Sequence, residues 1–530
     1  MMKSSFLLSH SVERSAEHAP DHQAFRFLDQ VLTYADVDEK SNQLARHLHE
    51  NGVRRGDRVA IFLNKCIETP IAVYGILKAG AAYVPLDPAA PVPRLQSVLQ
   101  DCRVQHVVTH QAKAKEVRQL VANETILHVV GIDNCEEAES CTSWEMIYDL
   151  PASRLVTNTT EQDLAYIMYT SGSTGTPKGI MHTHASGLSY ARLSADTYDV
   201  DSTDVLSNHS PLHFDMSTFD FLTGPLCGAT TVIISEAHAR LPASLSQLIQ
   251  DESITIWYSV PFALIQLLLH GVIEKRDLSS LRWVLFGGEP FPPKYLAALM
   301  QLWPNARFSN VYGPAEVNQC TFYHLPTRRT DWNGQIPIGK VWANSEGIVV
   351  DTDDCLVPVG EPGELLIRSP TMMRGYWGRS DLNEKAFFYR SITSDVHDVF
   401  YRTGDLVRVQ ADGEMQFLGR KDRQIKVRGH RVELDEVESV LASHPHVKEA
   451  AAYDVPSLED TRQIEAAVVL RADMQATEKE LKDHVSSRLP IYAIPHLIRI
   501  MATFPRTATD KIDRRQLQEE AIAKESNGET

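Results

Sequence analysis

The sequence predicts an α/β protein with a large N-terminal domain of layered α/β subdomains and a β-rich subdomain, followed by a small α+β C-terminal domain. The chain has 530 residues, whereas a single domain usually has about 100–200. Short apolar runs rich in Val, Ile and Tyr alternate with helical patterns up to about residue 340. After that point the runs become strand-like and are joined by turns, which indicates a change of architecture.

The first part of the chain alternates buried strands with helices. A helical pattern covers Cys66–Gly80, directly after an apolar run. Buried strands that alternate with helices pair mostly in parallel, so these runs predict α/β layers. The expected strands are Arg58–Leu63, Ala81–Pro88, Arg103–His110, Ile254–Val260 and Arg282–Gly288.

The strand-like pieces EGIVV, GELLIRS and LVRVQADGEMQFLG follow residue 340 and predict the β-rich subdomain. Helical and strand patterns then alternate again and predict the C-terminal α+β domain. We therefore expect a large domain at 1–419, a small one at 420–530 and a hinge within Gly419–Gln424. The expected elements of the small domain are a helix at Glu433–Ser443, strands at Val447–Val455 and Ile464–Ala472, and a helix at Thr477–Leu489.

Composition excludes several classes of protein. The net charge of −17 argues against general nucleic-acid binding, which needs a basic face. The seven cysteines form no CxxC pair and no zinc-like cluster, so reduced thiols are expected. The apolar run at Phe6–Leu8 is too short for a secretory signal, and no stretch approaches the roughly 18 apolar residues of a membrane span. We expect a soluble, cytoplasmic protein with no nucleic-acid and no membrane partner.

The strongest local signal is a loop rich in glycine and hydroxyl groups, Thr170–Gly179, which follows an apolar strand. Glycines let backbone N–H groups approach an anion, and Lys178 adds a positive charge. The loop is not a Walker A motif, because Pro177 precedes the lysine and glycine follows it. A strand follows as well, so a hairpin-like phosphate loop is predicted rather than a solvated linker. Its proposed phosphate-binding residues are Thr170, Ser171, Gly172, Ser173, Thr174 and Gly175.

At this loop the sequence resembles the superfamily of adenylate-forming enzymes, which contains acyl-CoA synthetases, adenylation domains of nonribosomal peptide synthetases and luciferases. The resemblance extends over nearly the whole chain and is strongest to a stand-alone amino-acid adenylation enzyme. It implies ATP and Mg²⁺ as cofactors and a mobile C-terminal domain. The matching segments occur in the family's order, at Leu32–Leu48, Leu77–Pro88, Asn310–Cys320, Tyr401–Leu406, Gly419–Glu438 and Pro505–Leu517.

The resemblance assigns roles that the chemistry of each residue supports. Tyr312, with Gly313 beside it, offers an aromatic face for adenine. Glu316 is a hard oxygen ligand for Mg²⁺ and a catalytic residue. Asp405 can accept hydrogen bonds from the ribose hydroxyls, and Arg420 adds a cation near ribose or phosphate.

Two lysines and an aspartate complete the implied machinery. Lys511 matches the lysine that bridges the substrate carboxylate and the α-phosphate, and Lys178 is the second catalytic cation. Asp422 matches the hinge residue about which the family rotates its C-terminal domain. Two positions depart from the family pattern. Ala315 replaces a usual threonine, which predicts weaker ATP binding. Thr509–Asp510 replaces the usual Asn-Gly before the lysine, but the lysine is kept, so activity is still expected.

The segment Pro211–Phe221 discriminates between substrates. In amino-acid-specific relatives the aspartate of Phe-Asp-x-Ser binds the α-ammonium group, and the match here is Asp215, whereas Asp220 falls outside the motif. The alternative is that Asp215 caps the following helix. The resemblance places eight residues without formal charge around the substrate side chain, which favours a neutral substrate. They are Met216, Phe219, Ser259, Leu285, Gly287, Val311, Gln319 and Cys320.

These assignments predict ATP-dependent activation of a neutral amino or imino acid as aminoacyl-AMP. Proline and small to medium neutral amino acids all meet the expectation. No carrier segment with a Gly-x-x-Ser attachment site follows the adenylation unit. The expected acceptor is therefore the phosphopantetheine thiol of a separate carrier protein. Two alternatives are an acyl-CoA synthetase acting on a non-amino carboxylate and a binding module that has lost its chemistry.

Overall fold

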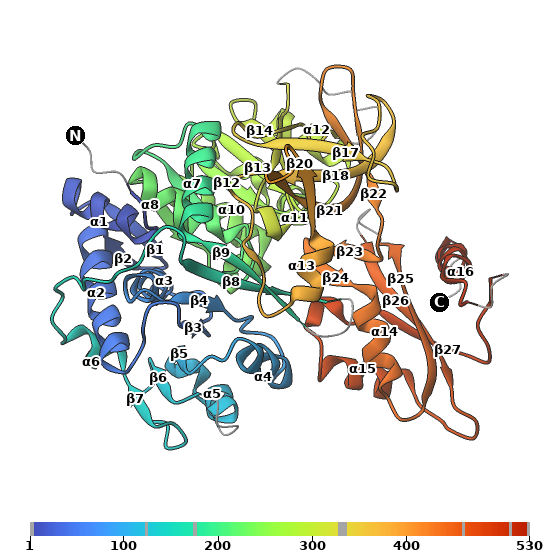
Figure 1. Cartoon of the computed structure of the whole chain (residues 1–530), viewed down its shortest axis with the longest axis horizontal. Helices are drawn as coiled ribbons and strands as arrows, with labels where there is room; N and C mark the ends of the chain where they lie inside the picture. Colours follow the sequence, from blue (N-terminus) through green and yellow to red (C-terminus); the bar gives the residue numbers. More distant parts are fainter. Residues whose placement is uncertain are drawn as a thin grey trace. The chain divides into compact units, whose positions relative to one another are not determined.

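The computed structural model describes residues 5–121, 126–172, 177–326, 336–457, 462–507 and 511–526 (Figure 1). The chain divides into two compact units, and their residues interleave along the sequence. The first unit contains Met1–Pro88, Leu99–Tyr169 and Gly179–Lys421, and the second contains Ala89–Val98, Thr170–Lys178 and Asp422–Thr530. Layered α/β sheets, a β-rich sheet and a small α+β unit confirm the predicted fold class.

A nine-stranded sheet, counted over the described residues, forms one layer of the first unit. Its central strands β11, β10, β12, β13 and β14 pair in parallel, as the buried apolar runs predict. The strands in spatial order are β16 (Lys340–Val341), β15 (Thr321–His324), β14 (Arg307–Tyr312), β13 (Trp283–Gly287), β12 (Ile256–Ser259), β10 (Val205–Asn208), β11 (Thr230–Ile233), β1 (Gln23–Phe27) and β2 (Gln30–Thr33).

A second large sheet has eight strands among the described residues. Its strands β8 and β9, which precede and follow the predicted phosphate loop, are hydrogen-bonded neighbours, as a hairpin-like arrangement requires. The strands in spatial order are β19 (Gly375–Tyr376), β9 (Lys178–Thr183), β8 (Leu164–Thr170), β4 (Ala82–Pro85), β3 (Arg58–Ile61), β5 (His106–Val108), β6 (His128–Val130) and β7 (Ser140–Thr142).

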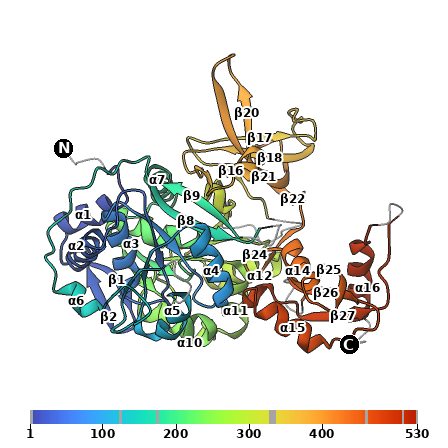
Figure 2. The ribbon, with the colours of Figure 1, turned by 60° about the horizontal axis from the view of Figure 1, so that its bottom comes forward.

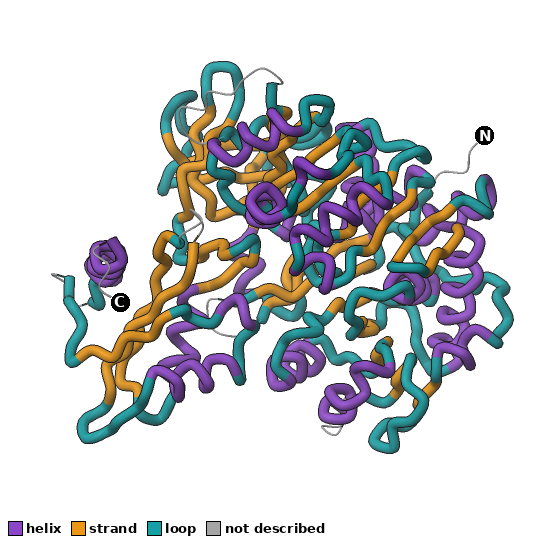
Figure 3. Tube along the Cα trace, turned by 180° about the vertical axis from the view of Figure 1, so that it is seen from behind, coloured by secondary structure: helices purple, strands orange, loops and turns teal. Residues whose placement is uncertain are grey.

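Helices flank the strands of both large sheets (Figure 3). Capping explains where two of them begin, at Thr33 and Thr183. The side chain of each threonine accepts the backbone N–H of the third helical residue, and the side chain of that third residue accepts the backbone N–H of the threonine. The helices before residue 400 are α1 (Ser9–His18), α2 (Tyr34–Glu50), α3 (Glu68–Lys78), α4 (Val92–Asp101), α5 (Ala114–Val121), α6 (Trp144–Tyr148), α7 (His184–Tyr198), α8 (Gly224–Cys227), α9 (Glu236–Arg240), α10 (Pro242–Asp251), α11 (Pro261–His270), α12 (Pro293–Leu302) and α13 (Ser380–Ala386).

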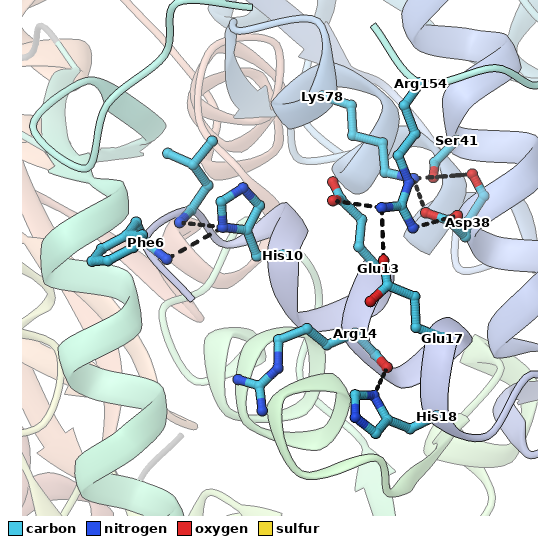
Figure 4. Close-up of polar contacts among 11 residues, drawn as sticks. Phe6, His10, Glu13, Arg14, Glu17, His18, Asp38, Ser41, Lys78 and Arg154 are labelled. Carbon is cyan, nitrogen blue, oxygen red and sulfur yellow. Dashed lines mark hydrogen bonds and ion pairs between the residues drawn. The ribbon is translucent and has the colours of Figure 1, made fainter. Parts of the chain in front are cut away.

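Ion pairs tie the first helices to a long connection that precedes β8 (Figure 4). Arg154 pairs with Glu17 on α1 at 3.0 Å and with Asp38 on α2 at 3.2 Å. Lys78, at the end of α3, pairs with the same Asp38 at 2.6 Å, and its side chain is only 5% exposed. Because a buried ammonium group needs a partner, Asp38 fixes α3 against α2.

The β-rich part of the first unit is a sheet in which β20 and β21 extend as a hairpin (Figure 2). Antiparallel pairing agrees with short strands joined by turns. Its strands are β17 (Glu346–Val350), β18 (Pro362–Arg368), β20 (Phe387–Ser391), β21 (His397–Val409) and β22 (Met415–Arg420).

The second unit has its own apolar core around two small sheets. The capping box at Thr477 and Glu480 starts one of its helices, as the polar residues before that apolar pattern indicate. Its elements after residue 422 are β23 (Gln424–Val427), β24 (His430–Glu433), α14 (Leu434–Ala442), β25 (Val447–Pro456), β26 (Arg462–Leu470), α15 (Glu478–Ser486), β27 (Leu497–Met501) and α16 (Arg514–Ser526). Across the described ranges, no helix has the length and apolar character that a membrane crossing requires.

Candidate active site

The turn after β14 holds the carboxylate of Glu316 in a fully buried position. Glu316 lies in the 3₁₀ turn Ala315–Val317 and is 0% exposed. The hydroxyl of Tyr376 donates a hydrogen bond to its Oε1 at 2.7 Å. His182 Nε2 lies 2.9 Å from the carbonyl oxygen of Ala315 and donates to it. Two side chains from β19 and β9 therefore fix the turn on which the carboxylate stands.

The glycine before this turn is required by a close backbone approach. A Cβ atom at Gly313 would lie 1.9 Å from the carbonyl oxygen of Asn318. Asn318 itself has a φ of 52°, in the left-handed region that few residues adopt at low cost. The two residues form a tight loop that returns the chain to β15.

Asp405 stands on an irregular part of β21 and is 4% exposed. Arg420 Nη1 donates to its Oδ1 at 2.5 Å, and the Tyr312 hydroxyl donates to its Oδ2. Burial, and next the nearby Asp405 carboxylate, raise the pKa of Tyr312 well above its usual value. The structure thus brings together three residues that the sequence assigned to adenine and ribose binding.

The described part of the phosphate loop begins with buried polar groups. Thr170 Oγ1 is buried and has no hydrogen-bond partner among the described residues. Ser171, which is 7% exposed, donates through Oγ to the backbone oxygen of Arg431 at 3.2 Å. Gly172 is buried, and Lys178 is the first residue of β9. The predicted phosphate-binding residues Ser173, Thr174 and Gly175 lie outside the described residues.

The predicted catalytic lysine and hinge aspartate both belong to the second unit. The main chain of Lys511 pairs with Thr507: the Thr507 N–H donates to its carbonyl at 2.8 Å, and its own N–H donates to Thr507 Oγ1 at 3.2 Å. Lys511 is exposed. Asp422 is the first residue of the main segment of this unit, and its Oδ1 accepts the N–H of Gln424 at 3.2 Å.

Asp215 precedes a helical segment that includes the π-helical turn Phe219–Thr223. An N-cap side chain accepts from the second or third residue of its helix, whereas Asp215 Oδ1 accepts the N–H of Met216, the next residue, at 3.0 Å. Burial chiefly raises the pKa values of Tyr190 and Tyr258, and the Asp215 carboxylate raises both further. The Asp215 charge therefore acts on buried aromatic hydroxyls.

Most residues predicted to line the side-chain pocket meet around one apolar cluster. Phe219, Leu285 and Val311 belong to it, and Met216 packs against it. A Cβ atom at Gly287 would lie 2.2 Å from the carbonyl oxygen of Val311, so glycine lets β13 and β14 approach closely. The cluster also contains large aromatic residues that the sequence analysis did not assign, namely Tyr190, Tyr198, Tyr258, Trp283 and Trp342.

Gln319 and Cys320, which are also predicted to line the pocket, differ in their surroundings. Gln319 is 3% exposed, and its Nε2 donates to the hydroxyl of Tyr198 at 2.7 Å. Cys320 belongs to a neighbouring apolar cluster, and its Sγ lies 3.6 Å from the carbonyl oxygen of Tyr312. Gln319 therefore bonds a residue of α7.

The structure does not group Ser259 with the other residues predicted to line the pocket. Successive side chains of a strand point to opposite faces. On β12, Ile256 and Tyr258 face the cluster of Phe219 and Leu285, whereas Trp257 belongs to a different core. Ser259 lies on the face of Trp257, whose Nε1 donates to its Oγ at 2.8 Å. Tyr258 faces the cluster instead, with its ring 5.6 Å from that of Phe219.

A buried polar network supports the segment that carries Asp215. Asn208 Nδ2 donates to Asp220 Oδ2 at 2.9 Å, and Lys65 Nζ donates to the backbone oxygens of Asn208 and His209 at 2.9 and 2.6 Å. Burial raises the pKa of Asp220 well above its usual value. Asp220 is thus buried and hydrogen-bonded to Asn208 on β10, which is consistent with a structural role for this carboxylate.

The residues present suit Mg²⁺ only together with phosphate oxygens. In the described ranges, no three or more His, Cys, Asp or Glu side chains are grouped so as to hold a metal. Mg²⁺ commonly binds one or two carboxylates plus substrate phosphates, and Glu316 offers one such carboxylate. The buried, unpartnered hydroxyl of Thr170 is likewise suited to an incoming phosphate oxygen.

Comparison with known sequences identifies two matched regions. The sequence model of the AMP-binding enzyme family matches residues 12–377, and that of the AMP-binding enzyme C-terminal domain matches residues 436–511. The L-proline–[L-prolyl-carrier protein] ligase of Pseudomonas fluorescens is 31% identical over 509 residues, which are 96% of this chain and 98% of that protein.

Other relatives are much longer or are known by their structures. A linear gramicidin synthase of Brevibacillus parabrevis is 34% identical over 97% of this chain, but the chain spans only 10% of that protein. The amide bond synthetase McbA from Marinactinospora thermotolerans has the same fold, with a TM-score of 0.86, 22% identity, and coverage of 97% of this chain and 99% of that one.

Proposed function

The chain belongs to the AMP-binding enzyme family, and we propose that it activates a neutral amino or imino acid as aminoacyl-AMP. ATP is the second substrate, since members of this family form AMP from it. The aminoacyl group is then transferred to the phosphopantetheine thiol of a separate carrier protein. The relative from Pseudomonas fluorescens, 98% of whose length this chain matches, is a proline–carrier protein ligase, which supports both steps.

The position of Asp215 carries the assignment of an amino acid. The next residue, Met216, packs against the apolar cluster that contains Tyr190 and Tyr258, and the Asp215 charge acts on the hydroxyls of both tyrosines. An α-ammonium group placed at this carboxylate would gain a charge-assisted hydrogen bond in partly apolar surroundings. The apolar side chains beyond it favour a neutral substrate side chain, and proline or a small to medium neutral amino acid meets this condition.

The first half-reaction is in-line attack of the substrate carboxylate on the α-phosphorus of ATP, with release of pyrophosphate. The reacting groups repel each other, so catalysis depends on positive charge and fixed geometry. In this proposal Lys178 and Lys511 supply charge. Tyr312, Asp405 and Arg420 hold the nucleoside.

Mg²⁺ would be held by Glu316 and would neutralise phosphate charge when bound. The buried position of Glu316, its bond from Tyr376 and the bond from His182 to the same turn support a fixed carboxylate at this point. The chain itself needs no covalent intermediate.

Pyrophosphate exchange tests the activation step. The assay is run with all proteinogenic amino acids, their common D-isomers, and several aryl and fatty acids. Strong exchange with one or a few neutral amino acids is expected. Asp215→Asn should reduce this exchange by about a hundredfold or more, because the α-ammonium group loses its charged partner. Asp277→Asn, at an exposed turn, is the matched control.

The acceptor is tested separately, with CoA and with a phosphopantetheinylated carrier protein as thiols. Transfer to the carrier is expected. Exchange supported only by non-amino carboxylates, with transfer to CoA, would instead identify an acyl-CoA synthetase. Lack of exchange with every carboxylate would identify a binding module.

A further inference from the structure

Donors from three residues in two parts of the chain converge on the buried carboxylate of Glu364 on β18. The N–H of Gly404 donates to Oε1 at 3.2 Å. Arg402 Nη1 and Lys421 Nζ donate to Oε2 at 3.2 and 3.1 Å. The Glu364 side chain is only 6% exposed, so its charge depends on these partners. One side chain therefore fixes two points of the chain, the turn at Arg402–Gly404 and the residue Lys421.

The first of these points is the turn that carries Asp405. Pairing of β18 with β21 jumps from Glu364–Leu406 to Leu366–Arg402, so three residues of β21 bulge opposite one residue of β18. Gly404, at the middle of the bulge, has a φ of 71°. Its N–H points at Glu364, and the neighbouring Asp405 points at Tyr312 and Arg420.

The bulge is also held from its other end. Thr403 Oγ1 donates to the carbonyl oxygen of Leu365 at 2.7 Å and accepts the N–H of Asp405 at 3.1 Å. Thr403 is 2% exposed. The direction of the Asp405 carboxylate is thus set by its bulge, and Glu364 binds the centre of that bulge.

The second point is Lys421, the last residue of the first unit. Its N–H donates to the carbonyl oxygen of Gly404 at 2.9 Å, and its ammonium group binds Glu364. Both the main chain and the side chain of Lys421 are therefore attached to the bulge. The main segment of the second unit begins at the next residue, Asp422.

We propose that Glu364 is a positioning residue that fixes the nucleotide-binding carboxylate of Asp405 and anchors the end of the first unit at Lys421. It touches no reacting atom in this proposal. The inference rests on the proposed function only in taking ATP as the ligand of Asp405. Any rotation of the second unit would then start after Lys421, while the nucleotide-binding turn stays in place.

A second glutamate of the same sheet provides a matched control. Glu346 on β17 pairs with Arg368 at 3.1 Å and with Arg390 at 2.8 Å. Its side chain is 34% exposed, and these partners lie outside the bulge. Glu346→Gln therefore removes a comparable charge from the sheet without touching Gly404 or Lys421.

The test compares Glu364→Ala, Glu364→Gln and Glu346→Gln in the full chain. ATP is titrated by calorimetry without amino acid, and KM and kcat are measured by pyrophosphate exchange. Glu364→Ala should raise the Kd and KM for ATP by about tenfold, whereas the KM for the amino acid stays within about twofold. Glu364→Gln should recover part of the ATP affinity, because an amide oxygen still accepts the Gly404 N–H. Glu346→Gln should match the wild type.

Limited trypsin digestion tests the anchor independently of activity. Cleavage after Lys421 should be faster in Glu364→Ala than in the wild type, and unchanged in Glu346→Gln. An unchanged Kd for ATP in Glu364→Ala, even with a lower Tm, would overturn the proposal and leave a purely structural role. If the wild type exchanges pyrophosphate with no amino acid while Glu364→Ala still weakens ATP binding, the proposed function fails and this inference stands.

Discussion

At the scale of single residues, Tyr258 and Ser259 occupy opposite faces of β12, and we expect only Tyr258 to contact substrate. Tyr258 faces the apolar cluster beside Asp215, and Ser259 faces the core of Trp257. The sequence could identify the strand, because its apolar run is bounded by polar residues. It could not decide which of the two neighbouring residues faces the cluster, because both precede the same Val-Pro boundary and a shift of one position exchanges the two faces of a strand.

Substitution of these neighbours separates the two assignments. Tyr258→Ala should change the amino-acid profile of pyrophosphate exchange, because it removes a large ring packed against Phe219. Ser259→Ala should leave the profile unchanged. It should lower the free energy of unfolding by about 1–3 kcal/mol, because the indole N–H of Trp257 loses its acceptor. A changed profile in Ser259→Ala with none in Tyr258→Ala would restore the original assignment.

At the scale of secondary-structure elements, the sequence predicts strands and helices better than the contacts between them. The parallel strands β3, β4, β12 and β13 and the helix α3 coincide with predicted runs, because burial on both faces leaves a continuous apolar pattern. The supports of Glu316 were not predicted. Tyr376 lies 60 residues away along the chain, and a single tyrosine carries no local signal of such a bond.

His182 provides a test of the contact between β9 and the Glu316 turn. Burial lowers its pKa to about 4, although the Ala315 carbonyl and the Glu316 charge oppose this effect. The folded pKa lies below the unfolded value of about 6.5, so the neutral ring stabilises the fold fully above that pH. The contribution is lost as the pH falls toward 4.

Urea unfolding at pH 7.5 and pH 5.0 measures this contribution. His182→Gln keeps a donor for the Ala315 carbonyl but cannot titrate. The loss of unfolding free energy between the two pH values should be about 2 kcal/mol smaller in the variant than in the wild type. Equal losses in both proteins would mean that His182 does not remain neutral in the fold.

At the scale of the whole molecule, the sequence predicted two domains from the change in texture and from the order of motifs. The structure divides between Lys421 and Asp422, two residues after the position chosen from the sequence. Residues Ala89–Val98 and Thr170–Lys178 group with the second unit, and this interleaving could not be predicted. Local patterns report each segment's own periodicity and not the partners that it packs against.

Asp422 is the position at which rotation of the second unit can be tested. Asp422→Pro fixes φ near −65° and removes the backbone N–H, so it should restrict rotation about this residue. Pyrophosphate exchange should stay within about threefold of the wild type, whereas thioester formation should fall by about a hundredfold or more. Asp422→Ala is the control, because it loses the bond to the Gln424 N–H but keeps the backbone free to rotate.

The two half-reactions are measured on the same preparations, by exchange and by single-turnover transfer to the carrier thiol. An equal loss of both half-reactions in Asp422→Pro would show that the substitution damages the adenylation site itself, and loss in Asp422→Ala would assign the effect to the side chain. Selective loss in the proline variant alone would place the pivot at the first residue after the Lys421 anchor.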